Sequence, residues 1–309
     1  MNYLSEPIFQ DKTAARKWLE AQLWPDGPVC PHCGGCECST KVKGKSARAG
    51  LYMCNGCRKQ FTITVGTIFE RSHIPLNKWL LTTFLMCASK KGMSAHQLHR
   101  MLGVSYKTAW FMCHRVREAM RDNPKLGPLG GTNKVVEADE TYVGGKAANR
   151  KHHVPPKEPV LALIERQGHV RTHHVPAVNG KTLRPILNEQ IAKGSYLMTD
   201  DSTVYPPLAQ EMGVSHGTVN HSIEEYVRGG FWHTNTAENY FSIFKRGIIG
   251  TYHHVSQQHL KRYLAEFDFR YNERSGLGVN DAERTTRALK GIVGKRLTYR
   301  RTDKPEAFA

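Results

Sequence analysis

Long apolar runs and acidic residues are both scarce in this sequence of 309 residues. No apolar stretch reaches the roughly 18 residues that a membrane-spanning helix needs, so we expect no membrane segment. The first thirty residues hold several charged side chains and lack the apolar core of a signal peptide, which predicts a cytoplasmic location. Asp and Glu number 27 against 44 Lys and Arg, so the formal net charge is +17. An excess of this size indicates a polyanionic partner, most often nucleic acid.

Cysteine is absent after position 113, and all eight cysteines lie between positions 30 and 113. In a reducing compartment this distribution favours metal binding over disulfides. Four of the cysteines form two C-x-x-C pairs with twenty residues between them, Cys30 with Cys33 and Cys54 with Cys57. This spacing is typical of a zinc ribbon that holds one structural Zn²⁺ and leaves no open position for catalysis. His32, Cys36 and Cys38 remain alternative ligands, and buried thiols acting as apolar residues are a further alternative.

A helical region follows the cysteine pairs. Apolar residues recur at helical spacing from Leu76 to Met120, and Ser94 and Ser105 stand where helix N-caps are expected. Two helices joined by the turn Gly103-Val104-Ser105 predict a helix-turn-helix that reads DNA. The alternative is a helical hairpin whose basic face is only solvated. The residues expected to contact DNA from that face are Lys107, Thr108, His114, Arg115 and Arg117.

The second half of the chain is organised around carboxylates. Strand patterns place Asp139 in a strand that ends in a glycine turn, and Asp200 directly after a later strand. A helix that opens at Asn235 carries Glu238, and Lys245 follows on the same face about two turns later. Strands that alternate with helices predict an α/β domain with a mixed sheet. Carboxylates in this arrangement suit two Mg²⁺ ions that assist phosphoryl transfer, with the lysine beside a DNA phosphate.

Spacing alone leaves other readings of these carboxylates open. Asp139 also fits a solvated strand residue, and Glu137 shares its face of the strand. Asp201 competes with its neighbour Asp200 for the second position. Asn235 and Glu238 match a helix capping box, which would explain the glutamate without any chemistry.

Several ordered motifs resemble the bacterial insertion-sequence transposases of the DDE type that carry an amino-terminal zinc ribbon, the ISXO-like group. The motifs are Glu137-Ala-Asp139-Glu140-Thr-Tyr-Val-Gly-Gly-Lys146, Met198-Thr-Asp200 with Tyr205, His233-Thr-Asn-Thr-Ala-Glu238 continuing to Lys245, Gly250-Thr-Tyr-His-His254, and the segment from Tyr263 to Asn272. The resemblance implies a ribonuclease-H-like catalytic domain. It also implies that Asp139, Asp200 and Glu238 hold two Mg²⁺ or Mn²⁺ ions, with Lys245 as a catalytic basic residue and Lys245 and Arg246 on DNA.

The implied function is cleavage at the terminal inverted repeats of a mobile element and joining of its 3′-hydroxyls to target DNA. Pairing of two element ends predicts a homodimer or a higher homo-oligomer that is associated with the nucleoid. A non-catalytic DNA-binding regulator and a metal-dependent nuclease without strand transfer are the alternatives. The expected layout is a helical arm (1–24), a zinc ribbon (25–68), a helix-turn-helix (69–124), a linker (125–131), the catalytic domain (132–275) and a basic tail (276–309) that is either a DNA-contacting segment or a solvated helix.

Overall fold

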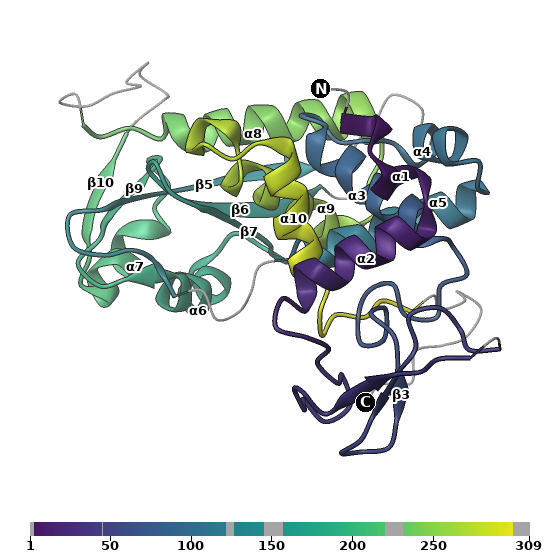
Figure 1. The fold of residues 1–309 in the computed structure, drawn as a ribbon. Helices are drawn as coiled ribbons and strands as arrows, with labels where there is room; N and C mark the ends of the chain where they lie inside the picture. Colours follow the sequence, from purple (N-terminus) through teal and green to yellow (C-terminus); the bar gives the residue numbers. More distant parts are fainter. Residues whose placement is uncertain (1–2, 45, 122–126, 145–156, 220–230, 299–309) are drawn as a thin grey trace, which may run out of the picture. The chain divides into compact units, whose positions relative to one another are not determined.

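The computed structural model describes residues 3–44, 46–121, 127–144, 157–219 and 231–298 (Figure 1). The chain divides into two compact units, one made of Met1–Arg121 with Gly278–Ala309 and the other of Asp122–Leu277. Two predicted features lie partly outside the described residues. These are the end of the first carboxylate motif, at Gly145 and Lys146, and the part of the tail beyond residue 298. Within the described ranges no helix is both long and apolar enough to cross a membrane.

The first unit combines a small antiparallel sheet, in the order β1-β2-β3, with helices from both ends of the chain. Its elements are η1 (Tyr3–Ser5), α1 (Pro7–Gln10), α2 (Lys12–Leu23), β1 (Ser39–Lys41), β2 (Tyr52–Cys54), β3 (Gln60–Phe61), α3 (Leu76–Ala88), α4 (Ala95–Leu102), α5 (Tyr106–Ala119) and α10 (Asp281–Lys290).

The amino-terminal helices belong to the core of the first unit. Asp11 begins α2 by accepting hydrogen bonds from the N–H groups of Thr13 (2.9 Å) and Ala14 (2.7 Å). Phe9 and Leu19 are buried, and both α1 and α2 pack against α3. The sequence suggested a separate arm over residues 1–24, whereas these helices bury apolar faces in the same core as α3.

The helix pair α4 and α5 forms where the sequence predicts it. Ser94 accepts from the N–H of Gln97, and Ser105 accepts from the N–H of Thr108, so both helices carry the expected side-chain caps. Gly103 ends α4 with φ at 60°, in the left-handed region that favours glycine. Leu98 is fully buried, which places the apolar face of α4 in the core.

The segment after residue 277 returns to the first unit. Ala288, Leu289 and Ile292 are fully buried, and α10 packs against α3. The guanidinium of Arg284, which is also buried, donates to the carbonyl oxygen of Cys87 (3.1 Å). The prediction of a basic tail or a solvated helix is therefore wrong over α10, because this helix buries apolar side chains and packs against α3.

The second unit is a layered α/β domain, as the strand and helix patterns predict. Its elements are β4 (Leu129–Gly130), β5 (Val135–Val143), β6 (Glu158–Glu165), β7 (Val170–His174), α6 (Gly180–Gln190), β8 (Ile191–Ala192), β9 (Tyr196–Thr199), α7 (Tyr205–Met212), β10 (Ser215–Thr218), α8 (Asn235–Gly247), a short π-helical turn η3 (Ile248–Tyr252), α9 (Gln257–Asn272) and η4 (Ser275–Leu277).

The main sheet of this unit is mixed, with strand order β10-β9-β5-β6-β7. β5, β6 and β7 run antiparallel to one another, whereas β9 is parallel to β5 and β10 is parallel to β9. Side chains on one face, including Val136 and Ala138 of β5, pack with α6 and α7. Side chains on the other face, including Val143, pack with α8 and α9. Helices therefore cover both faces of the sheet (Figure 1).

The second unit begins earlier than the sequence suggests. Residues 125–131 were expected to form a linker, but Leu129 and Gly130 form β4, which pairs in parallel with β8. Leu129 is buried in the core beside α6, and the N–H of Gly130 donates to the Glu165 carboxylate (2.8 Å). The glycines of this segment favoured a linker in the sequence, but Gly130 has a structural reason within the short strand. It adopts φ at 87°, and its position beside Ser195 leaves no room for a side chain.

Candidate metal centres and DNA-contacting surface

Four cysteines of the first unit lie around one point. The ligand atoms of Cys30, Cys33, Cys54 and Cys57 are all within 4.8 Å of one another. The Sγ atoms of Cys30 and Cys57 are 3.7 Å apart, as are those of Cys33 and Cys54. Thiolates bound tetrahedrally at 2.3 Å to zinc are about 3.8 Å apart, so the four sulfurs fit one ion.

Backbone turns aim these sulfurs inward. At the first pair, the N–H of Gly34 donates to the carbonyl oxygen of Cys30 (2.9 Å). At the second, the N–H of Cys57 donates to the Sγ of Cys54 (3.5 Å), which lowers the pKa of the Cys54 thiol to about 6. A thiol with a lowered pKa loses its proton more readily to a metal, because the thiolate is the ligand form. Cys54 is therefore the thiol of the second pair that is prepared for metal binding. The backbone hydrogen bond from Lys59 lowers the pKa of Cys57, but burial and the neighbouring cysteine thiols outweigh it and raise this pKa to about 12.

The alternative zinc ligands differ in where they point. His32 Nε2 lies 3.4 Å from the carbonyl oxygen of Gln60, and the Cys36 thiol donates to the carbonyl oxygen of Gly34 (3.7 Å). Both side chains are thus engaged with the backbone. Cys38 is different, because its Sγ lies 3.5 Å from that of Cys54, directly beside the four-sulfur group.

Three carboxylates of the second unit form another cluster. Ligand oxygens of Asp139, Glu140 and Asp200 lie within 4.8 Å of one another. Asp139 lies on β5 and Asp200 follows β9, and these neighbouring parallel strands bring the two together. The N–H of Ser202 donates to the Asp200 carboxylate (3.1 Å), which orients it, whereas Asp201 is exposed and outside the cluster. The structure thus favours Asp200 over its neighbour.

Glu140 is the member of this cluster that sequence reasoning left without a role. Its carboxylate accepts a hydrogen bond from the hydroxyl of Tyr205, which is buried on α7. Burial, together with the charges of Asp200 and Asp139, raises the pKa of Glu140 to about 7, although the tyrosine hydrogen bond works in the opposite direction. Its position next to Asp139 in β5 was the available signal, but Tyr205 is 65 residues away in the chain.

Glu238 lies on α8 and is not part of the three-carboxylate cluster. Its side chain is exposed, as are those of Lys245 and Arg246 in the last turn of the same helix. The capping-box alternative for Glu238 is wrong, because α8 begins at Asn235 and Thr234 occupies the N-cap position without a side-chain cap. The first N–H groups of the helix are bound instead by the buried carboxylate of Glu137.

The basic face predicted on α5 is only partly exposed. Lys107 is exposed and Thr108 is half-buried, but His114, Arg115 and Arg117 are 1%, 8% and 2% exposed. The prediction of an exposed face is wrong for these three residues. Because α5 contacts α3, α4 and α10, these three residues are covered as well as its apolar ones.

Arg115 shows what such a buried cation does. Its Nε donates to the carbonyl oxygen of Leu297 (3.2 Å), and its Nη1 donates to that of Glu70 (3.1 Å). Its guanidinium lies 4.8 Å from the centre of the Phe111 ring. Burial, together with the charge of Arg296, lowers the pKa of Arg115. The side chain therefore ties together segments of the first unit from both ends of the chain.

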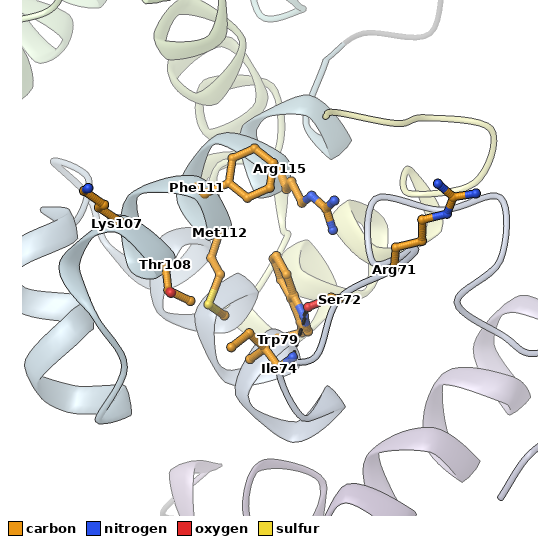
Figure 2. Close-up of a pocket in the computed structure, with 9 residues that line it drawn as sticks. All are labelled: Arg71, Ser72, Ile74, Trp79, Lys107, Thr108, Phe111, Met112 and Arg115. Carbon is orange, nitrogen blue, oxygen red and sulfur yellow. Dashed lines mark hydrogen bonds between the residues drawn. The ribbon is translucent and has the colours of Figure 1, made fainter. Parts of the chain in front are cut away.

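A pocket of about 260 Å³ opens beside α5 in the same unit. Its lining includes the aromatic residues Trp79 and Phe111 and the basic residues Arg71 and Lys107. Figure 2 shows these two cations at opposite sides of the pocket, with the aromatic side chains between them. A basic rim around aromatic surface is suited to contact with nucleic acid.

Comparisons with known proteins find transposase domains in both halves of the chain. The ISXO2-like transposase domain family matches residues 128–272, and the transposase zinc-ribbon domain family matches residues 10–60. An uncharacterized protein of the transposable element ISH50 from Halobacterium salinarum is 28% identical over 281 residues, which cover 85% of this chain and 91% of the relative. The zinc-ribbon match includes the four clustered cysteines, and the transposase-domain match includes the three clustered carboxylates. The chain thus carries an ISXO2-like transposase domain, preceded by a transposase zinc-ribbon domain.

Proposed function

We propose that this protein is a DNA transposase that binds the ends of its element, cleaves there and joins the freed 3′-hydroxyls to target DNA. The observation that carries the proposal is the cluster of Asp139 and Glu140, in the middle of β5, with Asp200, which follows the end of the neighbouring strand β9. The mixed sheet with helices on both faces supports a ribonuclease-H-like catalytic domain. The match to a transposase domain family supports the same reaction class.

In this proposal Asp139 and Asp200 hold two Mg²⁺ or Mn²⁺ ions, with Glu140 and Glu238 as the further carboxylates. Hard carboxylate oxygens are the ligands that these ions prefer. When bound, such ions stabilise the charge that develops on the attacking and leaving oxygens of an in-line phosphoryl transfer. Lys245 and Arg246 extend from the last turn of α8 as exposed cations, and we assign them to DNA phosphates beside the carboxylates.

The first unit is assigned to DNA binding on the basis of its charge. It contains 26 Lys and Arg against 11 Asp and Glu, a net of +15, whereas the second unit contains 18 against 16, a net of +2. Almost the whole excess charge of the chain therefore belongs to the unit with the zinc ribbon and the helix pair. Within it, exposed Lys107, neighbouring Thr108 and the basic pocket are the proposed contacts, and a single Zn²⁺ on the four cysteines holds the ribbon.

The test compares Asp200→Asn with Asp201→Asn in Mg²⁺, with donor cleavage, strand joining and a gel shift on the same element ends. Asp200→Asn removes the metal-binding charge and is expected to lower cleavage by several orders of magnitude while end binding persists. Asp201→Asn serves as the matched control and should cut at nearly the normal rate, because its carboxylate lies outside the cluster.

Three other outcomes would contradict the proposal in different ways. Normal cleavage by both variants would mean that the chemistry takes place elsewhere. Cleavage without joining by the wild-type protein would identify a nuclease. End binding without either reaction would identify a DNA-binding regulator. Because the reaction requires two ends, we also expect a homodimer on DNA, which light scattering of the protein–DNA complex would detect.

A further inference from the structure

Glu137 is a fully buried carboxylate whose two oxygens are both engaged. Its Oε1 accepts from the Nε of Arg166 (2.6 Å) and from the hydroxyl of Thr236 (3.0 Å). Its Oε2 accepts from the N–H groups of Thr236 (2.9 Å) and Ala237 (3.0 Å). These N–H groups open α8, so a residue of β5 caps this helix from 99 residues away, where the positive end of the helix dipole also favours a carboxylate.

Arg166 extends the same network in other directions. One terminal nitrogen, Nη1, donates to the carbonyl oxygen of Phe231 (2.8 Å). The other, Nη2, donates to the carbonyl oxygen of His233 (2.9 Å) and contacts the Sδ of Met198 (2.9 Å). The planar guanidinium thus joins the end of β6 to β9 and to the segment that leads into α8.

Three contact points of this network lie one or two residues before a carboxylate assigned to the metal site. Glu137 lies two residues before Asp139 on the same face of β5. Met198 lies two residues before Asp200, and Ala237 immediately precedes Glu238. The network therefore links the three elements that carry the proposed ligands, at points one or two residues away from them.

We propose that the Glu137–Arg166 pair is a positioning device that fixes β5, β9 and α8 relative to one another so that their carboxylates bind divalent ions together. The proposal rests on the proposed function, because it concerns the same metal site. Neither residue is assigned to the metal or to DNA. A second ion pair, Glu266 with Arg270 in α9, is also buried, and its arginine side chain is less exposed than that of Arg166 (7% against 19%). The contacts described for it run to Tyr252, Phe267 and within α9, not to β5, β9 or α8. It provides a matched control.

The main variant is Arg166→Lys, which keeps both charges but loses the planar fork that reaches Met198 and the carbonyl oxygens. The probe is Mn²⁺, titrated into the full-length, zinc-loaded protein and followed by the electron paramagnetic resonance of the free ion. We expect affinity to fall by roughly 10- to 100-fold, the usual effect of removing a residue that supports metal ligands. The control Arg270→Lys should lower thermal stability without changing Mn²⁺ affinity. Equal Mn²⁺ affinity in Arg166→Lys and wild type would overturn the proposal.

Two further variants separate the possible failures. If Arg166→Lys does not fold, Thr236→Ala removes only one hydroxyl contact to Glu137, and it is expected to weaken Mn²⁺ binding as well; unchanged binding in this variant also overturns the proposal. Asp200→Asn tests the metal site itself. If Asp200→Asn binds Mn²⁺ as the wild type does, the site is misassigned and the proposed function fails; if Asp200→Asn loses Mn²⁺ and the network variants do not, only the positioning role fails.

Discussion

At the scale of single residues, local spacing predicted partners that are close in sequence and missed those that are distant. The four zinc cysteines were found because each C-x-x-C pair is complete within one turn. Glu140 was missed because its environment is created by Tyr205, far along the chain. Glu137 was noted only as a neighbour of Asp139, since nothing in its sequence surroundings indicates that it caps α8.

The raised pKa of Glu140 gives a stability prediction for the metal-free protein. In the folded state this pKa is about 7, compared with a usual value of 4.5, so between these values the folded chain holds a proton that the unfolded chain has lost. Stability contributed by this group is therefore full below pH 4.5 and falls as pH rises towards 7. A difference of this size corresponds to roughly 3 kcal/mol, given 1.36 kcal/mol per pKa unit.

Glu140→Gln should accordingly stabilise the protein at pH 8 in the presence of a chelator for divalent ions that spares the zinc. The gain should shrink to nothing near pH 4.5. Urea unfolding of the second unit at both pH values measures it, with exposed Asp201→Asn as a control that should show no such gain. A destabilised Glu140→Gln protein at pH 8 would show that the ionised carboxylate is not penalised by its surroundings.

At the scale of elements, the ends of helices and the presence of strands were predictable, whereas the faces of helices that other elements bury were not. Ser94, Gly103 and Ser105 mark the limits of α4 and α5 because caps and left-handed turns depend on local chemistry. The mixed sheet followed from alternating patterns in the second half. The burial of Arg115 and Arg117 did not, because the neighbours that cover α5 come from distant segments, including α10.

The difference between exposed and buried cations of α5 can be measured. Lys107→Ala should weaken binding to element ends and reduce the slope of log K against log salt by about 1, because one fewer counterion is released. Arg115→Ala should instead lower the melting temperature of the first unit, since two backbone carbonyls lose their donor, at about 1–3 kcal/mol. Salt titrations of DNA binding and thermal unfolding of both variants distinguish the two roles. If Arg115→Ala changes the salt slope of DNA binding and leaves stability unchanged, Arg115 contacts DNA and the structural role is wrong.

At the scale of the whole molecule, the second unit is an insertion in the sequence of the first. The first unit is built from both ends of the chain, and the Asp122–Leu277 segment lies between them. Residues nearly two hundred positions apart in the sequence meet in the core of the first unit, as the hydrogen bond from Arg284 to Cys87 illustrates. The expectation of consecutive domains could not reveal this, because composition near the end of the chain shows only its excess of basic residues. The carboxyl-terminal segment therefore matters for folding as well as for charge.

Removing the segment after Leu277 should therefore unfold the helical part of the first unit and spare the second. Leu289 and Ile292 are fully buried, and each contributes roughly 1.5–3 kcal/mol to stability. The N–H of Gly294 also donates to the carbonyl oxygen of Gly66 (2.8 Å), a contact that the truncated chain loses. Hydrogen exchange followed by mass spectrometry should show lost protection in α3 and α5 but retained protection in β5 and β6. A chain that ends at Thr298 keeps all of these contacts and should exchange like the full protein. Full protection of α3 in the shorter chain would mean that α10 only rests on a core that is already complete without it.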